Sequence, residues 1–159
     1  MINFIEKGRG LILSVKAAGH RVWHQDRVCY STNDEAVQAI IDSYDPLPLS
    51  RTDAKKRLVE QFNLVMEGLE AEYPEVEKRT FTKQEAEARA FIIDSNANTP
   101  TLSPIALARG ISLIDLVTKT LVKADLYTAQ VGALIGQRQY KEDLIDAEAD
   151  WLAVEGINL

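Results

Sequence analysis

The segment Ser112–Asp146 constrains the fold most, because its apolar residues recur at helical spacing over many turns. One line advances by alternating steps of three and four, which keeps its members on one side of a helix. These members are Ile114, Val117, Leu121, Ala124, Thr128, Val131 and Ile135. A second line, formed by Leu113, Thr120, Tyr127 and Leu134, recurs every seven residues beside the first. The segment predicts a long helix whose stripe is wide enough for a helical bundle or a groove-forming surface.

Small side chains form a further strip on this helix. Ala124, Thr128, Gly132 and Gly136 lie four residues apart, so another helix could approach closely there. Each glycine weakens an isolated helix by about 1 kcal/mol relative to alanine, so the pair indicates close packing or a bend. Packing within the chain and packing against another molecule both fit this pattern, and we favour the first because bundles use the same geometry.

The pattern predicts an α+β protein with a small N-terminal head and a mainly helical body. We expect a head at residues 1–45, a proline-containing linker at 46–50, a helical body at 51–150 and an apolar tail at 151–159. Pro46 and Pro48 suggest the linker, because two prolines in three positions cannot continue a preceding helix. Trp151 and the apolar residues after it are expensive to leave in water, so the tail should dock on the body or on a partner.

Within the head, short motifs predict a strand, a helix, a hairpin and a second helix. The signals are a strand at Ile2, Phe4 and Ile5, a helix from Leu11 to Ala18 ending at Gly19, and strands at 20–24 and 27–30 around a turn at Gln25 and Asp26. Capping-box pairs then predict helix starts at Thr32 with Glu35, Ser50 with Asp53, Thr82 with Glu85, and Ser112 with Asp115. A short helix should run from Ser103-Pro104 to Gly110.

Composition and charge exclude several classes of function. Apolar residues make up 46% of the chain and charged residues 26%, which is typical of a globular protein. The net charge of −6 disfavours nucleic-acid binding, and the basic run Lys55-Lys56-Arg57 is read as a solvated helix face. The apolar stretches are too short to cross a membrane, and residues 1–10 lack a signal-peptide core. With one cysteine, Cys29, we expect folding in the cytoplasm.

The residue patterns favour a protein without enzymatic activity. His20 and His24 share one strand face, and Cys29 lies on the facing strand, so a metal site or a Cys–His nucleophile pair is conceivable. A half-exposed hairpin explains the same residues, since a fourth ligand and an activating basic group are both missing. Gly8-Arg9-Gly10 lacks the remaining features of a phosphate-binding loop, so no cofactor is implied.

Several segments resemble small tail-fibre assembly proteins of tailed bacteriophages, prophages and tailocins. In the body these segments are Thr82–Ala90, Thr99–Leu102, Ile105–Gly110, Lys123–Asp125 and Val131–Arg138. In the head they are Ile2–Gly8 and Ala36–Pro46, so the resemblance covers most of the chain. The resemblance implies a chaperone that helps a tail fibre fold and trimerise, often by binding its distal receptor-recognition end, without ATP. The alternative is a structural tail or baseplate protein that is retained in the virion.

These interpretations lead to expectations about partners and place of action. The expected partner is a phage tail fibre or receptor-binding protein, with self-association as a further possibility, and with neither nucleic acid nor membrane as a partner. The expected location is the host bacterial cytoplasm during assembly, or the virion tail for the alternative. The wide stripe and the apolar tail point to Tyr127, Val131, Leu134, Ile135, Trp151 and Leu152 as partner-binding residues.

Overall fold

The computed structural model describes residues 1–4 and 6–159, and confirms the predicted α+β class with a small N-terminal sheet and a long C-terminal helix. The chain forms two compact units. Unit 1 contains residues 1–59 together with 140–159, and unit 2 contains residues 60–139. These boundaries differ from the predicted ones, because residues 46–59 and 140–159 belong to the same unit as residues 1–45. Ile5, one of the predicted strand positions, lies outside the described residues.

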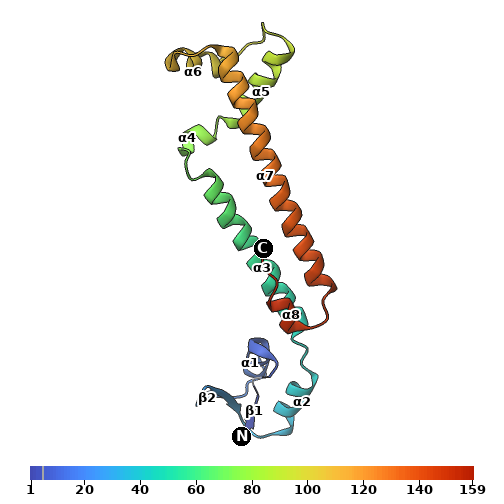
Figure 1. Ribbon diagram of the computed structural model, residues 1–159. Coiled ribbons are helices and arrows are strands. Elements are labelled where there is room, and N and C mark those ends of the chain that lie inside the picture. The colour runs from blue at the N-terminus through green and yellow to red at the C-terminus, as the bar shows by residue number, and fades with distance from the viewer. Residues whose placement is uncertain (5) are drawn as a thin grey trace. The chain divides into compact units, whose positions relative to one another are not determined.

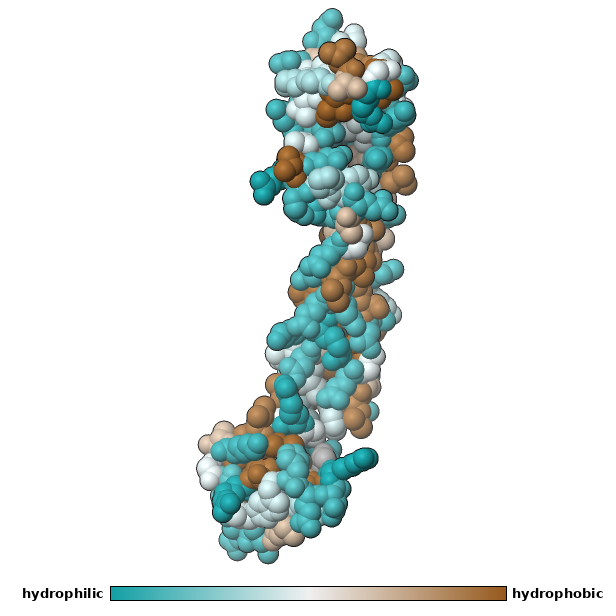
Figure 2. Space-filling view, turned by 90° about the vertical axis from the view of Figure 1, so that its left-hand side faces the viewer, coloured by the Kyte–Doolittle hydropathy of each residue, from teal (hydrophilic) through white to brown (hydrophobic). Residues whose placement is uncertain are grey.

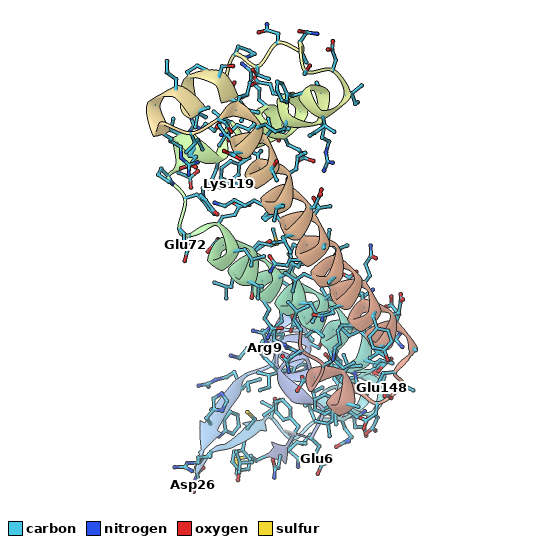
Figure 3. The ribbon with its side chains drawn as sticks, turned by 45° about the horizontal axis from the view of Figure 1, so that its top comes forward. Glu6, Arg9, Asp26, Glu72, Lys119 and Glu148 are labelled. Atoms are coloured by element: carbon cyan, nitrogen blue, oxygen red, sulfur yellow. The ribbon has the colours of Figure 1, made fainter. Side chains whose placement is uncertain are left out.

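A three-stranded antiparallel sheet opens unit 1. Strand β3 (Val28–Ser31) lies between β1 (Ile2–Asn3) and β2 (Val22–Gln25). The β2–β3 hairpin turns at Asp26 and Arg27, one residue later than predicted, and Figure 3 labels Asp26 at its tip. Both turn residues have positive φ, 51° and 66°, which fits the twist of a two-residue hairpin turn.

Two helices pack with this sheet around one apolar cluster (Figure 1). They are α1 (Gly8–Ala17) and α2 (Glu35–Ser43). The buried members of the cluster are Phe4, Leu11, Val15, Cys29 and Val37. Gly10 allows close packing in α1, because a Cβ atom there would overlap the side chains of Tyr44 and Leu49. The expected helix stop is confirmed by Gly19, whose φ is +87°.

Three of the four predicted capping boxes are wrong. Asp34, rather than Thr32, caps α2 by accepting a hydrogen bond from the backbone N–H of Val37 at 2.8 Å. Ser50 and Thr82 lie inside helices, in α3 (Leu47–Glu70) and α5 (Phe81–Ile93). These helices start earlier than predicted, and Ser50 is 7% exposed, so burial rather than capping explains its place.

The expectation of an extended linker at residues 46–50 is also wrong, because Leu47 already begins α3. Pro48 is compatible with this start, since the first helical turn does not need its missing N–H. The backbone N–H of Leu47 donates to the side chain of Asp45 at 2.9 Å, which caps the new helix. The two prolines therefore start a helix in place of separating two domains.

In unit 1, α3 packs with the end of α7 (Leu113–Ala147) and with α8 (Trp151–Glu155). Ala54, Leu58, Ile145 and Val154 are each fully buried in this second cluster. Arg51 of α3 donates to the backbone carbonyls of Ile145, Asp146 and Glu148, which satisfies acceptors at the end of α7. Figure 3 labels Glu148 just beyond this helix end.

Unit 2 has its own core at the start of α7. Its helices are α4 (Glu75–Lys78), α5, α6 (Leu102–Arg109), residues 60–70 of α3 and residues 113–139 of α7. The buried core residues are Ala88, Leu102, Ala106, Leu116 and Val117. The helix start at Ser112 is confirmed, because its hydroxyl accepts a hydrogen bond from the backbone N–H of Asp115 at 3.1 Å. Helix α6 ends at Gly110, as predicted, and Gly110 adopts the left-handed conformation.

Candidate protein-interaction surface

Two helices of unit 2 lie side by side without forming a core (Figure 1). This paired-helix segment comprises residues 60–70 of α3 and 118–139 of α7. All of these residues are described by the structure, and none of them is buried. The facing side chains are half-buried, and include Phe62, Met66 and Leu69 on α3 with Val131, Leu134 and Arg138 on α7. Two helices alone leave part of every apolar stripe in contact with water.

Polar and cation–π contacts join α7 to α3 and to the turn that follows α3. The Tyr127 hydroxyl donates to the Glu70 carboxylate at 2.6 Å, and this hydrogen bond raises the pKa of Tyr127. The ammonium of Lys123 lies 5.4 Å from the ring centroid of Tyr73. The guanidinium of Arg138 lies 5.7 Å from the ring of Phe62. Such contacts are of modest strength at exposed sites, so the segment gains little stability from its own pairing.

Exposed apolar side chains occur on both helices of this segment. On α3, Leu64 is 68% exposed and Val65 is 41% exposed. On α7, Val122 is 54% exposed and Leu126 is 60% exposed. Figure 2 shows hydrophobic side chains among polar ones on the surface of the helical part. Clustered apolar exposure of this kind is typical of protein–protein interaction sites.

The six predicted partner-binding residues fall into both units. Tyr127 and Ile135 are 40% and 36% exposed, whereas Val131 and Leu134 are half-buried between the helices of unit 2. Trp151 and Leu152 belong to unit 1, where Trp151 is half-buried against Gly8 and Leu152 is 60% exposed. The exposed residues Leu64 and Leu126 were missed, because the prediction followed the wide stripe of the long helix and the apolar tail.

The predicted stripe matches the buried face of α7 only in part. Val117 is fully buried, as its position in the stripe predicts. Ile114, placed on the same line, is 50% exposed, while Leu116 is buried and was not assigned to the stripe. The buried face at the start of α7 therefore lies between the first predicted line and the second, which begins at Leu113. The reason is that α5 and α6 pack against that side of α7.

His20, His24 and Cys29, which the sequence offered as metal ligands or as a nucleophile pair, do not come together as one site in the described part of the chain. His24 Nδ1 lies 3.1 Å from the buried sulfur of Cys29, while His20 lies 3.5 Å from Asp34 instead. Among the described residues, no group of three or more His, Cys, Asp or Glu side chains could hold a metal ion. The hairpin thus brings together a pair, whereas a metal centre needs at least one further ligand.

A shallow hollow of about 450 Å³ lies against α3 and α4 in unit 2. Its lining comprises Asn63, Met66, Glu67, Glu70, Glu75 and Lys78. The ammonium of Lys78 pairs with the carboxylates of Glu70 and Glu75, so the lining is polar and carries more negative than positive charge. This ion-paired surface differs from an apolar ligand pocket with a few convergent polar groups.

Within the described residues, none of the helices combines the length and the apolar character that spanning a membrane requires. Comparison with protein-family models, with curated proteins and with solved structures finds no match for this chain. The paired-helix segment is a candidate interaction surface because both of its helices expose apolar side chains.

Proposed function

We propose that this protein is an assembly chaperone for a phage tail fibre, which it binds through exposed apolar side chains of the paired-helix segment. One observation carries the proposal. None of the described residues of this segment is buried, and its helices expose the apolar side chains of Leu64, Val65, Val122 and Leu126. The resemblance of the sequence segments to tail-fibre assembly proteins supplies the identity of the partner.

The physical requirements of fibre assembly fit such a surface. A β-rich trimer forms many contacts between distant parts of its chains, so it folds slowly and exposes strand edges and apolar surface meanwhile. A helical protein with accessible apolar side chains can cover that surface until the trimer closes. Binding and release of this kind depend on competition between contacts, so they require neither ATP nor a catalytic group.

Co-expression tests the proposal. The chaperone proposal predicts a fibre gene beside the gene for this protein, and that fibre would be expressed alone, with the wild-type protein, and with a Leu64→Asp variant. We expect the wild-type protein to raise the yield of soluble trimeric fibre, measured by size-exclusion chromatography with light scattering. Leu64→Asp should lower this yield to the level of the fibre alone, because the new carboxylate must be desolvated at the contact.

Leu107→Asp is the matched control, because Leu107 is 84% exposed in unit 2 but lies on α6, away from the paired-helix segment. Circular dichroism should show equal helix content for both variants. Equal fibre yields with and without the wild-type protein would refute the chaperone proposal. A fixed copy number of the protein in mature particles would favour the retained structural protein instead.

A further inference from the structure

Strand β2 lies at an edge of the small sheet in unit 1 (Figure 1). In the described part of the chain it pairs with β3 alone, over Val22–Gln25. The side of β2 that faces away from β3 is called the open edge below. An edge strand presents backbone N–H and C=O groups to which a further strand can bond. Native proteins often protect such an edge with lysine, proline or a bulge, and the four residues of β2 contain none of these.

The register of the hairpin determines which backbone groups face the open edge. A two-residue hairpin turn is closed by a hydrogen-bonded pair, which here is Gln25 with Val28. Hydrogen-bonded pairs then alternate along the ladder, so Trp23 also bonds to β3. The N–H and C=O groups of Val22 and His24 therefore point away from β3, toward the open edge.

The hydrogen bonds of β3 agree with this alternation. The carbonyl of Cys29, which lies opposite His24, accepts from the backbone N–H of Phe4 at 3.1 Å and so bonds away from β2. No described residue hydrogen-bonds to the backbone N–H or C=O of Val22 or His24. His24 is also exposed, so its backbone groups are accessible to another chain.

Two arginines flank the open edge. Arg21 directly precedes β2, Arg27 lies in the turn that follows it, and both are exposed. Among the described residues, neither arginine forms an ion pair. Residues 1–31 contain five basic and two acidic residues, although the chain as a whole has a net charge of −6. The open edge therefore lies in a positively charged part of an acidic protein, and this charge favours an anionic partner.

We propose that the open edge binds an extended segment of another polypeptide, with carboxylates at both ends of the paired stretch. This segment adds a fourth strand to the sheet and bonds to the backbone groups of Val22 and His24. Its carboxylates lie beside Arg21 and Arg27. On the outer face of the sheet, one of its side chains packs against Trp23, which is 38% exposed. The main-chain bonds supply affinity, and the arginines select acidic segments.

The backbone chemistry and the charge together exclude other occupants. A helix cannot bond to the open edge, because its own N–H and C=O groups are already paired internally. A second copy of this chain would bring two hairpins of the same positive charge together, including Arg21 and Arg27 of each copy. The inference does not rest on the proposed function, because it concerns unit 1, whereas the paired-helix segment belongs to unit 2.

Fluorescence anisotropy with the full-length protein tests the proposal. The probe is the fluorescein-labelled, end-capped peptide EVTVTE, which presents a carboxylate at each end whichever way it pairs. We expect saturable binding of this peptide to the wild-type protein. The peptide KVTVTK should bind about 10-fold more weakly or less, because its lysines meet the two arginines. In the double variant Arg21→Gln with Arg27→Gln, the two peptides should bind about equally.

A backbone substitution separates edge pairing from other modes of binding. Proline at position 24 removes the N–H that points outward, while Trp23 and Gln25 can still bond to β3. His24→Pro should therefore weaken the binding of EVTVTE by about 10-fold or more. His24→Ala is the matched control, because it loses the same imidazole but keeps the N–H, and it should bind like the wild type.

A modified peptide gives a second readout that leaves the protein unchanged. EVTVTE that is N-methylated at its four central amides keeps its side chains and charges but cannot donate from those amides, so it should bind at least about 10-fold more weakly. Equal affinity of the methylated and unmethylated peptides would overturn the proposal, as would the absence of wild-type binding at millimolar peptide. Equal wild-type affinity for EVTVTE and KVTVTK would overturn the selection of acidic segments. A dimer in sedimentation equilibrium that His24→Pro dissociates would make a second copy the occupant instead.

Discussion

Helices α3 and α7 contribute to both units, but the pair is buried to very different degrees in the two. In unit 1, Ala54 and Leu58 of α3 and Ile145 of α7 are fully buried together with Val154 of α8. In unit 2, none of the described residues 60–70 of α3 or 118–139 of α7 is buried. The sequence of α7 is no less apolar in the second region, so composition does not explain the contrast.

The two regions differ in whether a third helix covers the pair formed by α3 and α7. Two helices can bury only the narrow strip along which they touch, whereas a third element encloses that strip and excludes water from it. In unit 1 this element is α8, and Arg57 holds the chain after it by donating to the backbone carbonyls of Glu155 and Ile157. In unit 2 the paired-helix segment relies on the contacts of Tyr127 with Glu70 and of Arg138 with Phe62. The enclosed core of unit 1 stabilises the fold, whereas the paired-helix segment of unit 2 leaves apolar side chains accessible.

The largest effect should come from a charge placed in the enclosed core. Val154→Asp should destabilise the protein by about 4 kcal/mol or more, because the carboxylate would be buried without a partner. Leu152→Asp, on the same helix α8 but at a 60% exposed position, should change stability by only about 0.5 kcal/mol. Urea unfolding followed by circular dichroism measures both. Equal losses would show that α8 is not what closes this core.

The same truncation on the two parts of α7 gives a more graded comparison. Ile145→Ala should cost about 2–5 kcal/mol, because Ile145 is fully buried and leaves a cavity. Ile135→Ala should cost less, about 1–2 kcal/mol, because Ile135 is 36% exposed, so the truncation removes less buried apolar area and leaves no enclosed cavity. Thermal unfolding at several protein concentrations measures the difference. An equal loss of stability at Ile135 and Ile145 would mean that the paired-helix segment is covered in solution.

Replacing Glu87 should have a smaller effect on stability. Glu87 lies on α5, in the part of unit 2 that has a buried core. Its carboxylate, 7% exposed, accepts hydrogen bonds from the backbone N–H groups of Thr101 and Leu102 at the start of α6. Burial alone would raise the pKa of Glu87, but these hydrogen bonds together outweigh it and lower the pKa below the ordinary value of 4.5. The folded state therefore favours the ionised carboxylate.

The pH dependence of stability checks this role. A lowered pKa contributes stability that is fully present above pH 4.5 and is lost as the pH falls through the lower, folded-state value. Glu87→Gln should cost about 1–2 kcal/mol at pH 7, and the difference from wild type should shrink below pH 4.5. Glu85→Gln is the control, because Glu85 forms a partly exposed ion pair with Arg89. A loss at Glu87 that persists unchanged at low pH would contradict the assigned ionisation.

Local sequence determined several elements of this fold correctly. The start of α7 was predictable because the hydroxyl of Ser112 and the carboxylate of Asp115 are close enough in the chain to form a capping box. Gly19 and Gly110 mark helix ends because their positive φ favours glycine over other residues. The β2–β3 hairpin was predictable to within one residue, since β-branched and aromatic residues flank a polar turn.

Contacts between distant parts of the chain were not predictable in the same way. Glu87 caps α6, which begins fifteen residues later at Leu102, and no local spacing signals such a contact. In the apolar tail, Val154 is buried while Leu152 is exposed, although hydrophobicity would favour burying both. Pro46 and Pro48 suggested a linker, but the adjacent chain is helical because Ser50 and Ala54 pack into unit 1.

The sequence by itself therefore determined that residues 112–146 form one long amphipathic helix, because periodicity is a local property that repeats from turn to turn. It did not determine which side of that helix is covered, since apolar residues occur on two faces of it. Tertiary structure decided this, by placing α3 against Val131 and Leu134 and leaving Val122 and Leu126 exposed. The physical reason is that burial depends on which elements meet in space, and α8 meets this helix pair only at its unit 1 end.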